Sequence, residues 1–240
     1  MSTDSISNEI VVTEANIEAQ DRRAFLRRAG LAGAAIALAG CGASGKEIMA
    51  PEATASGAVV NPDGSIVLNF ATDIDVLNYA YALEQLEAAF YVTAVSNAAF
   101  SSIFSTSEQR VLTDIRDHEV VHKDFFAAAL GAAKIPNLTP RFGAIDFGSR
   151  TSVLQTAKTF EDLGVSAYNG AARYLASEAY LGVAGKIVSV EARHASAIRD
   201  ILNNRSGDFA PNAFDLGNTP QTVLTAAAPF ITESITVVNA

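Results

Sequence analysis

The sequence predicts an all-α protein, an up-down bundle of four long helices with a long crossover between the second and third helices. Within residues 71–204, four stretches place apolar residues at spacings of three and four, which is typical of helices that bury one face. The first and third stretches share one short motif and the second and fourth share another, which indicates a repeated helix pair. Residues 134–150 can extend about 50 Å, farther than the roughly 38 Å of a 25-residue helix. They are therefore long enough to form the crossover along the bundle.

The composition agrees with a helical domain that has a sizeable core. Of the 240 residues, 49% are apolar, none is tryptophan and only 7 are proline. The net charge of −9 argues against nucleic acid as a partner, because phosphate binding requires a basic surface. A single cysteine excludes an internal disulfide framework.

Residues 1–40 have the composition of an export signal. A basic segment that contains Arg22 and Arg23 precedes an apolar run over residues 29–39. That run is shorter than the about 20 residues that span a bilayer, and the order of basic, apolar and small residues is typical of a signal peptide. The paired arginines resemble the twin-arginine signal, which implies the twin-arginine export machinery as a partner.

The apolar run ends at Cys41, the only cysteine of the chain. The preceding residues Leu38, Ala39 and Gly40 resemble a lipobox, where the signal is removed and the new N-terminal cysteine carries lipid. We therefore expect an exported protein of the periplasm or cell envelope, anchored to the membrane through lipid on Cys41. An uncleaved anchor and a chance cysteine remain as alternatives.

Residues 41–70 are expected to form a tether and entry segment. They are rich in alanine, serine, glycine and proline, and residues 61–64 carry a turn signal. A flexible tether of this length spans roughly 30 Å on average. The apolar run 66–68 is compatible with a short strand or with a strip packed against the bundle.

The first two predicted helices span residues 73–100 and 105–133. Acidic residues open the first helix, where the helix dipole favours them. Ser105 and Glu108 form a capping-box pattern at the start of the second. The second helix is expected to end before Pro136.

The last two predicted helices span residues 151–175 and 180–203. Residues 205–240 follow as a C-terminal tail of loop-like composition. Within the tail, Pro220 occupies a favourable first position for a short helix that ends near Ala228. We expect this helix to pack on the bundle.

In each of the four long helices, a glutamate interrupts the apolar stripe. These residues are Glu84, Glu119, Glu161 and Glu191. A lone carboxylate that faces a core costs several kcal/mol even after relaxation. Four of them require a shared compensating charge, and two divalent cations supply +4 against −4.

Two of these glutamates begin a Glu-x-x-His motif, which adds His122 and His194 to the set. Side chains at positions i and i+3 lie on one face of a helix. Two facing motifs of this kind, with one glutamate from each of two further helices, form the carboxylate cage of di-iron and di-manganese proteins. We predict two Fe or Mn ions, held by Glu84, Glu119, His122, Glu161, Glu191 and His194.

The other two glutamates are each followed seven residues later by a tyrosine. The pairs are Glu84 with Tyr91 and Glu161 with Tyr168. We expect both tyrosines to be core aromatic residues that hydrogen-bond to a carboxylate of the metal site. The sequence leaves open which carboxylates bridge the two ions.

Three further features near the motifs are ambiguous. Glu87 could replace Glu84 as a ligand, although the matching spacing to the tyrosine favours Glu84. His118 is expected to face away beside the site. Gly164 and Gly170 either allow a close approach near the site or reflect the general alanine and glycine content.

Four motifs together carry a family resemblance, those at residues 83–91, 117–122, 161–168 and 190–195. Over roughly residues 66–230, the chain resembles the ferritin-like domain family that includes plant and bacterial desiccation-related proteins. The resemblance implies a ferritin-like four-helix bundle. By analogy with the wider di-metal group, it implies the same six ligands.

Two functions of different classes fit these observations. The first is an exported di-metal enzyme that uses O2 or peroxide, such as a ferroxidase or a manganese-catalase-like scavenger, in envelope stress protection. The second is a non-catalytic desiccation- or stress-related envelope protein whose metal is structural or absent. Iron storage in a closed cage fits less well, because a lipid-anchored tether suits a cage subunit poorly. Association into a homo-oligomer is left open.

Overall fold

A computed structural model describes residues 57–240 of the chain. The predicted export signal with Arg22 and Arg23, the lipidation site Cys41 and most of the expected tether lie outside the described residues. No helix in the described part is both long enough and apolar enough to cross a membrane.

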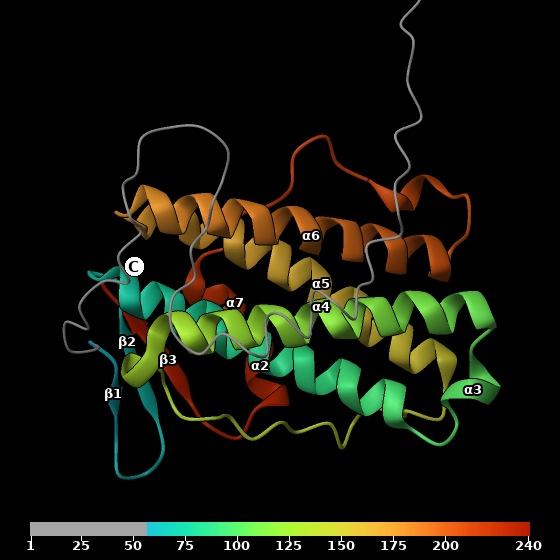
Figure 1. The fold of residues 1–240 in the computed structure, drawn as a ribbon, viewed down its shortest axis with the longest axis horizontal. Coiled ribbons are helices and arrows are strands. Elements are labelled where there is room, and N and C mark those ends of the chain that lie inside the picture. Colours follow the sequence, from blue (N-terminus) through green and yellow to red (C-terminus); the bar gives the residue numbers. More distant parts are fainter. Residues whose placement is uncertain (1–56) are drawn as a thin grey trace, which may run out of the picture. The chain divides into compact units, whose positions relative to one another are not determined.

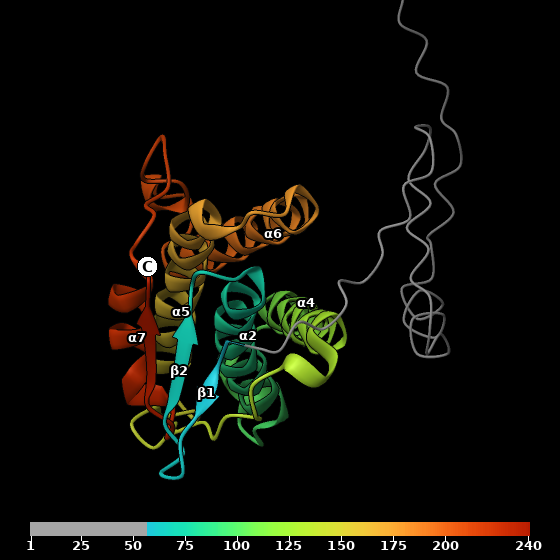
Figure 2. The same ribbon diagram turned by 90° about the vertical axis from the view of Figure 1, so that its left-hand side faces the viewer.

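Four long helices form the bundle. They are α2 (Asp73–Ser96), α4 (Thr106–Leu130), α5 (Arg150–Ala171) and α6 (Glu178–Leu202). Helix α2 packs mainly against α4, and α5 packs mainly against α6, so that two helix pairs face each other (Figure 2). Helices α4 and α5 run parallel, opposite to α2 and α6 (Figure 1). The structure confirms the predicted bundle of two helix pairs joined by a crossover.

Side-chain caps fix where the four helices begin. Thr72, Ser105, Ser149 and Ser177 each accept a hydrogen bond from a backbone N–H of the first turn, as N-cap residues do. The predicted capping box between Ser105 and Glu108 is present. Three helices end three or four residues earlier than predicted, because a short helix α3 (Phe100–Ile103) and the 3-10 turns η1 (Gly131–Ala133) and η2 (Ala172–Tyr174) follow them.

The crossover that connects α4 to α5 runs along the bundle and is hydrogen-bonded to α2 (Figure 1). Asn78 of α2 donates to the carbonyl of Ala133 at 2.9 Å and accepts from the N–H of Ile135 at 2.8 Å. Gln85 accepts from the N–H of Leu138 at 2.8 Å. These bonds satisfy buried backbone groups that have no partner in regular structure. They explain why α2 carries buried amides on a face that the crossover covers.

A small sheet closes one side of the bundle. Its strands are β1 (Val59–Val60), β2 (Ile66–Asn69) and β3 (Ile235–Val238), in the order β1-β2-β3. Strand β2 pairs antiparallel with β1 and parallel with β3. The run at residues 66–68, which the sequence left ambiguous, is therefore a strand, and its alternate side chains Ile66 and Leu68 enter the core. Gly64 supplies the positive φ of the hairpin turn that the sequence predicted.

The C-terminal segment packs along α5. After the turn η3 (Gly207–Phe209), helix α7 (Pro220–Ala227) begins with Pro220 at its first turn, as predicted, and the turn η4 (Ala228–Phe230) leads toward β3. A side chain at Gly170 of α5 would come within 1.8 Å of the carbonyl oxygen of Asn218, so that the chain can pass here only over a glycine. Nothing in the sequence analysis predicted β3 in this tail.

Candidate metal centre

The structure brings all six predicted ligands together at the centre of the bundle. Glu84, Glu119, Glu161 and Glu191 are each 0% exposed, while His122 and His194 are 9% and 4% exposed. One glutamate comes from α2 and one from α5, and the two Glu-x-x-His motifs come from α4 and α6. The motif spacing places each Glu and His on one helix face. The parallel course of α4 and α5 places Glu119 and Glu161 at similar depth.

The ligand atoms form two overlapping groups. The His122 site consists of Glu84, Glu119, Glu191 and His122, and the His194 site consists of Glu119, Glu161, Glu191 and His194. Within each group, one atom from every residue lies within 4.8 Å of the others. Each group therefore offers three carboxylate oxygens and one imidazole nitrogen to a common space.

Glu119 and Glu191 belong to both groups, and each points one oxygen to each site. Oε2 of Glu119 lies 3.6 Å from Nδ1 of His122, while its Oε1 lies 2.8 Å from Nδ1 of His194. For Glu191, Oε1 lies 2.8 Å from His122 and Oε2 lies 3.6 Å from His194. Each of these two carboxylates could therefore be shared between two cations, a question that the sequence left open.

Glu84 and Glu161 belong to one site each. Oε2 of Glu84 lies 3.6 Å from Nδ1 of His122, and Oε2 of Glu161 lies 3.4 Å from Nδ1 of His194. These two carboxylates therefore occupy the outer ends of the centre.

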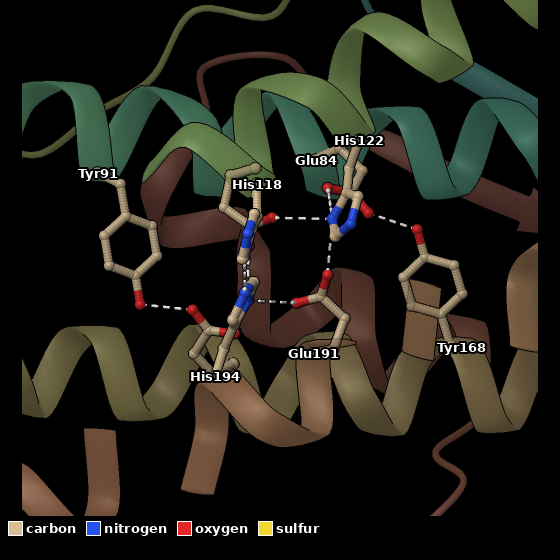
Figure 3. Close-up of polar contacts among 9 residues, drawn as sticks. Glu84, Tyr91, His118, His122, Tyr168, Glu191 and His194 are labelled. Carbon is tan, nitrogen blue, oxygen red and sulfur yellow. Dashed lines mark hydrogen bonds and ion pairs between the residues drawn. The ribbon is translucent and has the colours of Figure 1, made fainter. Parts of the chain in front are cut away.

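The two tyrosines cross between the helices that carry these outer carboxylates (Figure 3). Tyr91 of α2 donates its hydroxyl proton to Oε1 of Glu161 at 2.5 Å, and Tyr168 of α5 donates to Oε1 of Glu84. Each tyrosine thus holds the carboxylate of the opposite helix and leaves its second oxygen facing the centre. Hydrogen bonds of this kind orient metal ligands in proteins.

The remaining atoms of the centre fit cations and have no other partner. Among residues 57–240, the buried atoms without a hydrogen-bond partner include Oε2 of Glu84 and Glu161, both oxygens of Glu119 and Glu191, and Nδ1 of His122 and His194. Some N···O distances are as short as 2.8 Å, yet the atoms converge on a shared space and are not aligned as hydrogen bonds. Each unpaired buried polar atom costs about 1–3 kcal/mol, which a bound cation would offset.

Protons must balance the charge of this centre whenever metal is absent. Burial raises the pKa of the Glu84 carboxyl to about 8 and raises that of Glu161 well above its usual range, although the nearby histidines oppose the rise. Burial alone would lower the pKa of His194 and raise that of Glu119. The contacts between imidazoles and carboxylates outweigh burial, so that the pKa of His194 rises to about 12 and that of Glu119 falls to about 2. The pKa of His122 rises for the same reason.

The expectation that His118 faces away from the site is wrong. Its Nδ1 lies 2.9 Å from Nε2 of His194, and the two ring planes are nearly parallel, with centroids 5.2 Å apart and an interplanar angle of 12° (Figure 3). His118 and His122 are four residues apart on α4 and so share a helix face. That spacing could have indicated that His118 lies on the same side of α4 as His122. Its partner His194, however, lies on α6, and only the packing of the helices brings the two residues together.

Glu87, the alternative ligand on α2, is buried but lies outside both groups of ligand atoms. Its carboxylate faces Gly164 of α5, where an added Cβ would come within 2.9 Å of Oε1. Burial and the surrounding carboxylates raise the pKa of Glu87 well above its usual range. The structure therefore favours Glu84 over Glu87 as the ligand, as the tyrosine spacing did.

This donor set suits hard and borderline divalent cations. Carboxylate oxygens with imidazole nitrogen are ligands of Mn and Fe in proteins, whereas soft ions prefer thiolate. Two such ions that share carboxylates can carry out redox chemistry with a small oxidant, or they can hold four helices together.

One comparison with known proteins matches the fold and the centre. Residues 72–204 match the sequence model of the Ferritin-like domain, a range that contains all four long helices and all six candidate ligands. No protein of curated function gave a significant match. The narrower resemblance to desiccation-related proteins stays a prediction. Because the match covers more than half of the 240 residues, the chain belongs to the ferritin-like domain family.

Proposed function

We propose that the bundle binds two Fe or Mn ions and uses them in redox chemistry with O2 or peroxide, as part of stress protection in the cell envelope. The observation that carries the proposal is the pair of overlapping sites that share Glu119 and Glu191. Two isolated cation sites would not need carboxylates whose two oxygens point in different directions. Bound ions would supply a pair of one-electron redox centres next to each other.

Different residues would hold the ions and orient the carboxylates. Glu84 with His122, and Glu161 with His194, would each hold one ion, while the shared carboxylates span both. Tyr91 and Tyr168 would fix the outer carboxylates. Full burial of the four glutamates excludes bulk water, which strengthens the electrostatic attraction between ligand and ion.

Two small cavities lie among the helices that carry the candidate ligands. One cavity of about 20 Å³ is lined by apolar side chains together with Tyr79 and Tyr168, and another of about 10 Å³ is lined by Glu87, Gly164 and apolar residues; none of the six candidate ligands lines either cavity. A volume of this order holds about one water-sized molecule. A molecule of the size of dioxygen or peroxide would fit this scale.

Export would place this chemistry outside the cytoplasm. The paired Arg22 and Arg23 and the lipobox-like residues before Cys41 support an exported lipoprotein. The twin-arginine route would suit a protein that folds around its metal before export. The Cys41→Ser variant is expected to be exported but to leave the membrane fraction; unchanged membrane association would refute lipidation. Replacing Arg22 and Arg23 together by lysine is expected to block export.

A structural metal site is the second candidate, and one observation favours it. All four carboxylates are fully buried, and closed coordination is typical of structural metal sites, whereas catalytic sites keep a position open. In this case the ions would stabilise the bundle of a non-catalytic envelope protein.

Turnover separates the two candidates. Purified protein supplied with Fe(II) or Mn(II) is expected to consume O2 or peroxide repeatedly, and His122→Ala and His194→Ala should abolish this. Arg193→Ala, on the exposed side of α6, is the matched control and should retain activity. Metal binding without turnover would favour the structural candidate. Absence of any divalent metal binding would contradict both.

A further inference from the structure

The two metal sites differ in how their histidines are supported. Both histidines point Nδ1 at the carboxylates, at 2.8 Å from the nearest oxygen. On the other side of the ring, Nε2 of His194 meets Nδ1 of His118 at 2.9 Å. Among the described residues, Nε2 of His122 has no protein hydrogen-bond partner. The difference arises at a position where the two halves do not repeat. One residue before the motif glutamate, α4 carries His118 and α6 carries Val190.

The contact to His118 selects one form of the His194 ring. To bind a cation through Nδ1, the neutral imidazole must keep its proton on Nε2. That proton is then donated to Nδ1 of His118, which in turn carries its own proton on Nε2. The ring planes are nearly parallel, with an interplanar angle of 12° and centroids 5.2 Å apart, which suits an in-plane N–H···N hydrogen bond between the two rings. His194 is therefore oriented before any cation arrives, and such partners also raise the basicity of the ligand.

Burial adds to the difference. The side chain of His194 is 5% exposed, against 11% for His122, so that the His194 site is the more enclosed. His118 itself lies at the surface, and the hydrogen bond connects the enclosed site to the exterior of α4 (Figure 3). Nothing in the ligand set produces this asymmetry, since each site has three carboxylates and one imidazole.

We propose that His118 is a positioning residue for His194, and that the His194 site is therefore filled before the His122 site and binds its cation more tightly. The inference rests on the proposed function, because it needs cations at both sites. It adds an order of binding and a residue outside the predicted ligand set.

The chain is well suited to a direct test, because its only three histidines are the three of this centre. Full-length protein labelled with 15N in histidine gives three imidazole rings in long-range 1H–15N spectra, and substitution of each histidine assigns them. Zn(II) is the probe, because it is diamagnetic and has no redox chemistry. The first equivalent is expected to shift the His194 ring, with Nε2 protonated, and the second to shift the His122 ring.

Three variants separate positioning from a general structural role. His118→Val copies the residue at position 190 and is expected to weaken the first Zn(II) step by about 10-fold or more and to abolish the order. His118→Asn places an amide oxygen near the former Nδ1 and should restore most of the affinity. Val190→His provides the corresponding imidazole beside His122 and should strengthen the second step. His118 is exposed, so that thermal unfolding of the metal-free variants should change little.

Several results would overturn the inference while the proposed function survives. These are simultaneous filling of both sites, filling of the His122 site first, or a first step in His118→Val that equals that of the unmodified protein. Equal weakening in His118→Val and His118→Asn would also reject the hydrogen bond as the cause. If none of the three rings responds to Zn(II), the proposed metal centre is wrong, and this inference fails with it.

Discussion

The two helix pairs of the bundle carry the same ligands but different neighbours. Glu84 and Tyr91 on α2 correspond to Glu161 and Tyr168 on α5, and the two Glu-x-x-His motifs correspond on α4 and α6. Each tyrosine donates a hydrogen bond to the glutamate of the other helix pair. The residues beside these ligands do not follow the repeat.

Three positions show the departure from the repeat. His118 on α4 corresponds to Val190 on α6, and Glu87 on α2 corresponds to Gly164 on α5, which makes room for it. Gly170 on α5, over which the C-terminal segment passes, corresponds to Thr93 on α2. The repeat therefore determines which atoms face the candidate metal centre, while the neighbours that do not repeat give its two halves different surroundings.

The largest expected effect comes from removing a shared carboxylate. Glu119→Gln removes the negative charge that both sites share and replaces one of the two oxygens by an amide NH2, so it is expected to abolish tight binding at both, whereas Glu84→Gln should leave about one ion per chain. Glu191→Gln is the matched variant in the other helix pair and should behave as Glu119→Gln does. Equilibrium dialysis with Mn(II) followed by metal analysis measures the stoichiometry. Equal losses in the Glu84 and Glu119 variants would contradict the assignment of shared carboxylates.

The next effect is a pH dependence of the metal-free protein, to which both helix pairs contribute. The pKa of Glu84 is raised to about 8, so its stabilising contribution is complete below its unfolded pKa, near 4, and is lost as pH rises through 8. The pKa of His194 is raised to about 12, so its contribution also declines as pH rises above its unfolded value of about 6.5. Chelator-treated protein should therefore melt at lower temperature at pH 9 than at pH 5. Added Mn(II), which competes with protons, should restore more stability at high pH. A melting temperature that rises from pH 5 to pH 9 without metal would exclude this account.

A smaller effect on stability is expected where the C-terminal segment passes over Gly170 of α5, and it concerns only one helix pair. Gly170→Ala places a methyl group within 1.8 Å of the Asn218 carbonyl and should cost about 3 kcal/mol of stability, since backbone must move. Thr93→Ala at the corresponding position of α2 is the control and should be nearly neutral, because alanine favours helix. Denaturant unfolding of both variants provides the comparison. A neutral Gly170→Ala variant would mean that residues 217–218 do not pack as described.

The smallest effect should be the same in both halves. Tyr91→Phe and Tyr168→Phe each remove the hydroxyl that holds one oxygen of Glu161 or Glu84. Each change should destabilise the protein by about 1–2 kcal/mol, the cost of an unpaired buried acceptor. Because the two bonds are related by the repeat, unfolding experiments should give similar values for the two variants. A large difference between them would show that the symmetry of the tyrosines does not extend to their energetics.

Local patterns in the sequence predicted the bundle and the six residues that the structure brings together. Apolar spacing identifies a helix face, and a glutamate on that face already points into the core, so that Glu84 and Glu161 could be predicted without knowledge of the fold. The length of residues 134–150 was sufficient to predict the crossover. The start of α4 could also be predicted, because the capping box between Ser105 and Glu108 involves only residues that are close in the sequence.

Features that depend on distant partners could not be predicted in this way. Strand β3 is a short β-branched run that becomes a strand only by pairing with β2, far away in the sequence. The contact of His118 is with His194, on another helix. The shared role of Glu119 and Glu191 depends on which way each oxygen points, and that direction follows only from the packing of four helices.

The most direct test of the account is a Mn(II) titration of the chelator-treated protein followed by electron paramagnetic resonance. A shared two-metal centre should take up about two ions per chain. Because Glu119 and Glu191 would bridge them, the second ion should replace the spectrum of an isolated Mn(II) with that of a coupled pair. Two ions with spectra of isolated Mn(II), or no tight uptake at all, would contradict the central claim that these residues form one shared two-metal centre.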